Sequence, residues 1–173
     1  IKPANMLFYD QETIKIADFG IVKVQQRRPT GTQRLTPGTS AYMSPEAIQL
    51  PNSVDPRSDL YAVGAVGYYL LTGQPVFTAE NVVELCQMHV AATPISPSQA
   101  AKQPIPLELE SAILSCLEKS RAKRPQTARE LAQRILRSAE ATAWNIDEAD
   151  AWWGRHERGQ SQPPSLLSQS SSH

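Results

Sequence analysis

The stretch SDLYAVGAVGYYLLTG, residues 58–73, decides the fold, because it is apolar almost all round. A helix that is apolar on every side belongs in the centre of a protein rather than at its surface. Gly73 at its end and Pro75 just after it supply a stop. We therefore expect a central helix here, surrounded by other helices.

Three further segments carry apolar residues at helical spacing and are expected to form those surrounding helices. They cover residues 80–92, 107–118 and 127–139. In the last two, the apolar positions recur every three to four residues: Leu109, Ile113, Leu117, Leu131 and Ile135. Residues 19–57, by contrast, are rich in Thr, Pro, Arg and Gln, which predicts a long functional or disordered loop.

The C-terminal part of the chain divides into two segments. Residues 140–158 predict another helix, which carries Trp144, Trp152 and Trp153. These rings are expected to pack on the core, and the alternative is an aromatic surface for a partner, a second copy or an adjoining domain. Residues 159–173 are a low-complexity tail that cannot bury enough apolar surface to order itself.

Composition excludes several classes of protein. The 173 residues include 17 basic and 17 acidic side chains, so no net field points to nucleic acid or to an anionic membrane. The longest apolar run, residues 61–71, is shorter than the roughly 18 residues that a membrane span needs. Cys86 and Cys116 lack metal-site or disulfide spacing. We expect reduced, buried thiols and a cytoplasmic protein.

A short hairpin pattern opens the chain. The strands MLFY (6–9) and IKIA (14–17) flank a polar four-residue turn. That turn length predicts that Leu7 faces Ile16. The same register places Asn5 opposite Asp18 at the open end, about 4.8 Å away across the strands.

An amide oxygen and a carboxylate oxygen side by side are suitable ligands for a hard cation. Magnesium that bridges substrate phosphates takes only one or two ligands from the protein. The alternative is a surface hairpin whose end residues are merely solvated. Spacing alone does not decide between the two.

The motifs around this hairpin resemble those of the protein kinase family. IKPAN (1–5) resembles the catalytic loop, and ADFG (17–20) resembles the metal-binding loop. GTSAYMSPE (38–46) resembles the end of an activation segment, with Ser44 where alanine is commoner and with no expected effect of that change. DPRSDLYAVGAVGYYLLTGQPVF (55–77) and LEKSRAKRPQTARELA (117–132) resemble the segments that follow. Within them, the runs LTG (71–73) and KSRAKRP (119–125) resemble those of bacterial serine/threonine kinases.

The resemblance implies a kinase-like, mainly α C-terminal lobe with a small β-hairpin at the active site. The lobe would cover residues 1–139. The N-terminal lobe, with its glycine-rich loop, is absent from this chain, and the catalytic aspartate is expected to precede Ile1. We therefore expect a fragment that is inactive by itself.

The resemblance also assigns roles to the residues of the hairpin end. It implies that Asp18 chelates magnesium on the ATP phosphates and that Asn5 holds a second magnesium. Lys2 would place its ammonium against the transferred phosphoryl group. The implied activity is magnesium-dependent transfer of the ATP γ-phosphate to Ser/Thr hydroxyls of protein substrates. The alternative is a truncated, non-catalytic lobe that serves as a protein-interaction module.

Further residues receive positioning or structural roles from the resemblance. Thr39 would help to position the substrate, or else bond the local backbone. Glu46 and Arg124 would form a buried ion pair that ties the activation segment to the helical core. Asp59 would accept backbone N–H bonds from the catalytic loop, or act as a helix-start acid favoured by the dipole.

The loop between Asp18 and Glu46 carries three threonines among arginines, namely Thr30, Thr32 and Thr36. A phosphate on one of them would recruit a nearby arginine and order the segment. The alternative is a plain polar loop. We therefore hypothesise autophosphorylation at these positions.

Overall fold

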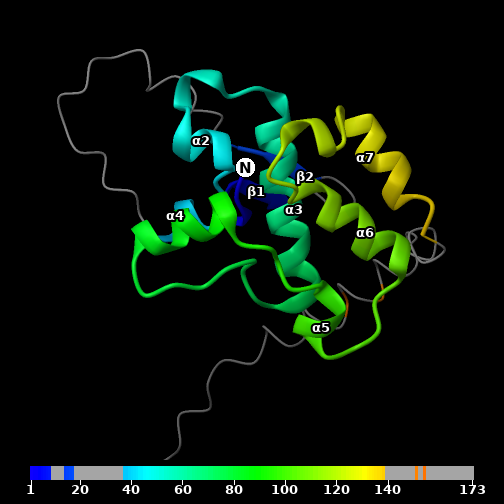
Figure 1. Ribbon diagram of the computed structural model, residues 1–173. Coiled ribbons are helices and arrows are strands. Elements are labelled where there is room, and N and C mark those ends of the chain that lie inside the picture. Colours follow the sequence, from blue (N-terminus) through cyan, green and yellow to red (C-terminus); the bar gives the residue numbers. More distant parts are fainter. Residues whose placement is uncertain (9–13, 18–36, 139–150, 152–153, 155–173) are drawn as a thin grey trace, which may run out of the picture.

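The computed structural model describes residues 1–8, 14–17, 37–138, 151 and 154 (Figure 1). The chain starts with a 3-10 turn and a two-stranded antiparallel sheet and continues as helices. The elements are η1 (Pro3–Asn5), β1 (Met6–Phe8), β2 (Ile14–Ile16), α1 (Pro37–Ser40), α2 (Pro45–Gln49), η3 (Pro51–Ser53), α3 (Pro56–Thr72), α4 (Val82–Ala91), α5 (Pro97–Ala101), α6 (Leu107–Cys116), η4 (Arg121–Lys123) and α7 (Ala128–Ile135). This confirms a mainly helical fold with a small hairpin.

Helix α3 is the predicted central helix. Asp55 caps its start by accepting the N–H of Arg57, and Pro56 occupies the first turn. Gly73 ends it in the left-handed conformation, with φ of 69°, and its N–H donates to the Tyr69 carbonyl. Helices α2 and α4 lie on one side of α3, and α6 and α7 on the other (Figure 1).

Two apolar clusters surround α3, which explains why its sequence is apolar almost all round. The larger cluster joins α3 to α4 and α6: Tyr61, Ala65, Tyr68, Val76, Phe77, Leu85, Ile113 and Leu117. The smaller joins it to α6 and α7: Leu60, Ala112, Cys116 and Leu131. At Gly64, a β-carbon would lie 2.5 Å from Cys116 Cβ, so glycine is what lets α6 approach α3 this closely.

The surrounding helices confirm the predicted positions of α4, α6 and α7 but are shorter than the predicted ranges. Asn81 and Thr127 cap α4 and α7 through their side chains. Each helix therefore begins at the residue after its cap, at Val82 and Ala128. Cys86 and Cys116 are free and buried, as the sequence predicts.

The prediction of one irregular loop over residues 19–57 is wrong in its second half. Helices α1 and α2 and the turn η3 lie within it, and α5 was missed as well. Each spans five residues or fewer, which is too short for a helical period to show. Each also begins with a proline, which suits a first helical turn as well as a loop.

Several predictions fall on residues outside the described part of the chain. These are the first half of that loop, the tail 159–173, and the helix 140–158 except for residues 151 and 154. Over the residues that the structure describes, no helix is long and apolar enough to cross a membrane.

Candidate active site at the hairpin and the helical core

Asn5 is the last residue of the turn η1, which leads directly into β1. Lys2 precedes the turn, and its carbonyl accepts the N–H of Asn5 at 3.0 Å. The carbonyl of Asn5 accepts the N–H of Ala17 at 2.7 Å, from the residue that follows β2. Both side chains are half-buried. The fold thus brings Asn5 across from the residue just before Asp18, which itself lies outside the described residues.

The strands pair one residue away from the predicted register. Met6 lies opposite Ile16, so the prediction of Leu7 opposite Ile16 is wrong. The paired strand ends leave five residues, 9–13, in the connection rather than four, and the connection length fixes the register. Asn5 is therefore opposite Ala17 and not opposite Asp18. The metal assignment consequently depends on the motifs and not on direct cross-strand pairing.

Thr39 lies in the short helix α1, half-buried, and its carbonyl accepts the N–H of Tyr42. The next helix, α2, begins at Ser44, whose hydroxyl accepts the N–H of Ala47 at 3.3 Å. Ser44 thus caps α2, a role that the sequence analysis missed when it treated serine and alanine as equivalent. The pattern Ser-Pro-Glu is itself a helix-start signal that would have revealed it.

Glu46 and Arg124 form a two-pronged ion pair in the interior. Arg124 Nη1 donates to Glu46 Oε1 at 2.7 Å, and Nη2 donates to Oε2 at 2.8 Å. The Arg124 side chain is 0% exposed and that of Glu46 is 6% exposed. The pair joins α2 to the segment before α7, across 78 positions of sequence.

Every N–H of the Arg124 guanidinium has an acceptor. Besides Glu46, these are the carbonyl oxygens of Arg57, Glu118 and Lys119, at 3.1, 2.7 and 3.2 Å. A buried charge with a full set of partners avoids the penalty of an orphaned one.

Glu46 has a third partner and a shifted titration. The Ser58 hydroxyl donates to its Oε1 at 2.5 Å. Burial acts to raise the pKa of Glu46, but the hydrogen bonds from Arg124 and Ser58 outweigh it and lower the pKa to about 2. The carboxylate is therefore ionised at any physiological pH.

A second carboxylate–arginine cluster lies at the start of α3, closer to solvent. Asp55 accepts hydrogen bonds from the side chains of Arg57 and Arg121, with an N–O distance of 2.8 Å to each. Arg121 also donates to the Ser53 carbonyl at 2.6 Å. The hydrogen bond from Arg57 is the main reason that the pKa of Asp55 is held well below its usual range.

Asp59 lies in the first turn of α3 and its side chain is exposed. That position suits the helix-start acid, one of the two roles weighed for it. A bond to the backbone of the catalytic loop stays a prediction.

A buried aromatic and basic cluster, which the sequence analysis did not find, lies beside the ion pair. His89 of α4 is 0% exposed, and its Nδ1 is 2.8 Å from the hydroxyl of Tyr61 in α3. Lys119 donates to the His89 carbonyl at 2.9 Å. Burial, together with the charge of Lys119, lowers the pKa of His89 to about 4. No local pattern reveals this cluster, because its members come from three separate segments.

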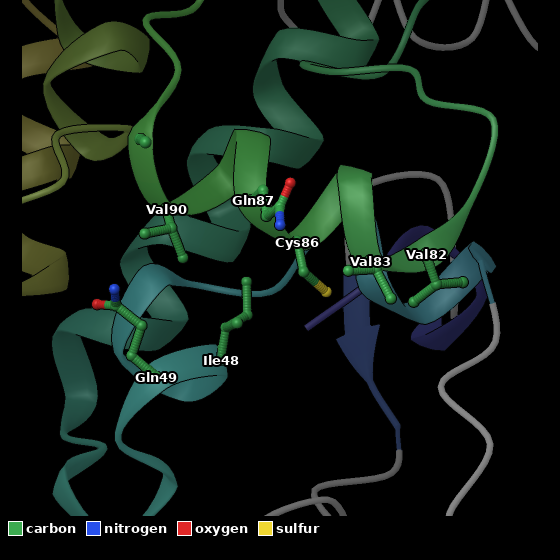
Figure 2. Close-up of a pocket in the computed structure, with 8 residues that line it drawn as sticks. Ile48, Gln49, Val82, Val83, Cys86, Gln87 and Val90 are labelled. Carbon is green, nitrogen blue, oxygen red and sulfur yellow. The ribbon is translucent and has the colours of Figure 1, made fainter.

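An open apolar groove lies between α2 and α4, with a volume of about 470 Å³. Figure 2 shows Cys86 and Val90 of α4 near Ile48 of α2, while Val82 lies at the other end of the lining. Gln49 and Gln87 supply amides to the lining, and none of the described lining residues is charged. Its chemistry suits an uncharged, apolar contact.

Comparisons with known proteins agree on one family. The model of the protein kinase domain matches residues 1–136. The serine/threonine-protein kinase PknB of Mycobacterium leprae is 37% identical over 138 residues, which is 79% of this chain and 22% of the relative. A probable serine/threonine-protein kinase PknB of Bifidobacterium longum is 38% identical over 138 residues, 79% of this chain and 20% of the relative. The chain thus spans about a fifth of the length of these relatives.

Proposed function

The chain belongs to the protein kinase family, with bacterial serine/threonine kinases among its relatives, and we propose that the protein carrying it phosphorylates proteins. The reaction is transfer of the ATP γ-phosphoryl group to Ser or Thr hydroxyls, with Mg²⁺. The protein substrates and ATP are its partners, and no nucleic acid is required.

The match of the protein kinase domain to residues 1–136 is the observation that carries the proposal, and the hydrogen bond between Ala17 and Asn5 supports the metal assignment. This bond fixes Asn5, directly before β1, against the residue that precedes Asp18. An amide and a carboxylate are hard oxygen donors, so this donor set fits Mg²⁺. When bound, magnesium neutralises charge on the phosphates. Asn5 and Asp18 would hold it, while Lys2 would orient the transferred group.

Thr39 is proposed to help to position the protein substrate. It lies in α1, the next described element after the hairpin and the one directly before α2. Helix α2 is fixed to the core through Glu46 and Arg124. The ion pair would therefore act on the reaction at a distance, by holding the segment that contains Thr39 in place.

The rest of the chain is proposed to extend the domain. Residues 1–139 form the C-terminal lobe of the kinase, 140–158 a helical extension with Trp144, Trp152 and Trp153, and 159–173 a tail. The protein is proposed to work in the cytoplasm, and its aromatic extension is a candidate surface for a second copy or an adjoining domain.

The second candidate function is a non-catalytic lobe that binds another protein. The open groove between α2 and α4 is the observation that favours it, because an apolar surface of this kind suits protein contacts. In that case the hairpin end would have no role in chemistry.

Substitution of Asp18 in the full-length protein decides between the two functions. We expect Asp18→Asn to reduce magnesium-dependent phosphate transfer from labelled ATP to background, because the amide cannot neutralise the cation. Asp10→Asn, the same change in the hairpin connection, is the matched control and should keep activity. Transfer that survives Asp18→Asn would refute the metal assignment. Residues 1–173 alone are expected to be inactive.

Thr30, Thr32 and Thr36 are proposed autophosphorylation sites. Mass spectrometry of the active full-length protein should find phosphate on at least one of them, and the Asp18→Asn variant should carry none. Unmodified threonines in an active preparation would refute this proposal.

A further inference from the structure

His89 is a buried histidine with one used and one unused ring nitrogen. Its Nδ1 is 2.8 Å from the Tyr61 hydroxyl, while its Nε2 is buried and has no hydrogen-bond partner among the described residues. The Phe77 ring meets the imidazole edge-on, with centroids 5.1 Å apart. A buried polar atom without a partner lowers stability, so an apolar residue would pack here at less cost.

The hydrogen bond assigns the proton positions. We assign the Tyr61 hydroxyl as the donor and His89 Nδ1 as the acceptor, with the imidazole proton on Nε2, because the hydroxyl has no other acceptor among the described residues. A second proton on His89 would create a positive charge close to two others, because Lys119 and Arg124 both face Tyr61 from the segment that follows α6. The imidazole is therefore a neutral acceptor.

Tyr61 connects this histidine to the buried ion pair. The Arg124 guanidinium lies over the Tyr61 ring, 5.0 Å from its centroid, and holds Glu46 of α2 with both of its ends. Lys119 meanwhile donates to the carbonyls at the end of α4, at 2.9 Å for His89. The chain of contacts therefore runs from α4 through Tyr61 and Arg124 to α2.

The same two helices also meet directly. Helix α4 packs on α2 and on α1, and the groove in Figure 2 lies along that contact. The position of α2, and with it that of the segment carrying Thr39, thus depends on α4 at two places. One is the direct contact, and the other is the polar chain that starts at His89.

We infer that His89 is a positioning residue for the proposed phosphoryl transfer: its bond to Tyr61 holds α4, the ion pair and α2 in one arrangement and so places the substrate-binding segment 37–46. This rests on the proposed function. It explains why the position holds a hydrogen-bond acceptor rather than an apolar side chain. His89 touches neither substrate nor ATP in this scheme.

The variants separate the hydrogen bond from packing. His89→Leu fills the site but accepts no bond, and Tyr61→Phe removes only the hydroxyl while keeping the ring under Arg124. His89→Asn retains an acceptor near the place of Nδ1. Ile113→Val is the matched control, since it removes one methylene group from the same apolar core but its side chain is not one of the hydrogen-bonded groups.

Steady-state kinetics of the full-length kinase give the first readout. We expect His89→Leu and Tyr61→Phe each to raise the KM for a protein substrate by roughly fivefold, the size of one lost neutral hydrogen bond. The KM for ATP should not change, and combining the two substitutions should add nothing. His89→Asn should restore part of the loss. An unchanged protein-substrate KM in Tyr61→Phe, which needs no repacking, would overturn the inference.

Hydrogen exchange gives a second readout that needs no activity. Amides of residues 38–49 should exchange faster in His89→Leu and Tyr61→Phe than in wild type, and Ile113→Val should leave them unchanged. Equal exchange in all variants would refute the positioning role. If the wild-type protein transfers no phosphate while exchange responds as expected, the proposed function fails and the link from His89 to α2 stands.

Discussion

Two carboxylate–arginine clusters of the helical core, both within the described residues, differ in how much water reaches them. In the first, the side chains of Glu46 and Arg124 are 6% and 0% exposed. In the second, those of Asp55, Arg57 and Arg121 are 27 to 31% exposed. The ion-pair distances are nearly equal, at 2.7 and 2.8 Å. The chemistry is the same, and the surroundings differ.

The difference teaches that distance alone does not measure the importance of an ion pair. Water can replace a lost partner in the Asp55 cluster, because its members are partly exposed. No water reaches the guanidinium of Arg124, so losing Glu46 would leave a buried charge uncompensated. The buried cluster should therefore be intolerant of change and the outer one tolerant.

Loss of the buried carboxylate should have the largest effect. Glu46→Gln keeps the shape but leaves Arg124 without its counter-charge, so we expect a loss of about 3–5 kcal/mol in the free energy of unfolding. Denaturant unfolding of the kinase domain measures it. The double variant Glu46→Gln, Arg124→Met should lose less, since it buries no charge. A loss no greater than that of Asp55→Asn would remove the distinction between the clusters.

A fall in pH should have the second largest effect on stability, because it protonates two buried groups in turn, first His89 and then Glu46. His89 has a pKa of about 4 in the fold against a usual 6.5, so the unfolded chain takes up the proton first. Stability is therefore present above pH 6.5 and is lost as the pH falls towards 4, by about 3 kcal/mol. Glu46, with its pKa lowered from 4.5 to about 2, extends the loss below pH 4.5.

Urea unfolding between pH 7 and pH 3 tests this order. His89→Leu should flatten the upper limb of the profile, and Glu46→Gln the lower one. Asp55→Asn is the control, because removing that carboxylate should leave the upper limb unchanged. A wild-type profile that is flat between pH 6.5 and 4 would contradict the assigned state of His89.

The outer cluster should respond less. Asp55→Asn removes both ion pairs but keeps an oxygen that can cap α3, so we expect a loss of about 1 kcal/mol or less. The matched change Asp59→Asn, one turn further along α3, removes only an exposed helix-start acid and should cost less still. Thermal unfolding of the two variants side by side measures the difference. A larger loss for Asp59→Asn would show that its carboxylate has a partner.

The smallest effect should come from the surface pair of α7. Glu130 and Arg134 are 2.6 Å apart, at positions i and i+4, and both are exposed or nearly so. Glu130→Gln keeps the hydrogen-bonding shape, and water replaces the lost charge. We expect a slightly lower melting temperature at low salt and none of that difference near 1 M salt. A salt-independent loss would place this pair with the buried one.

Much of the helical framework could be predicted because its signals are local. Continuous apolar character and the stop at Gly73 together mark α3, while the structure adds the cap at Asp55. The short helices α1, α2 and α5 could not be predicted, since five residues or fewer show no period. The hairpin was found but its register was not, because one residue more in the connection shifts every pair.

The candidate site divides in the same way. The sequence by itself determined the family and the residues of the hairpin end, because motifs such as KPAN and DFG are short and contiguous. The resemblance also implied the ion pair of Glu46 and Arg124, whereas only the tertiary structure decided that Tyr61 and His89 link this pair to α4. Tyr61 and His89 are 28 positions apart in the sequence, and Glu46 and Arg124 are 78 positions apart. No local periodicity in the sequence reveals a contact between segments this distant. Burial, the quantity that separates the two clusters, is likewise a property of the packed whole.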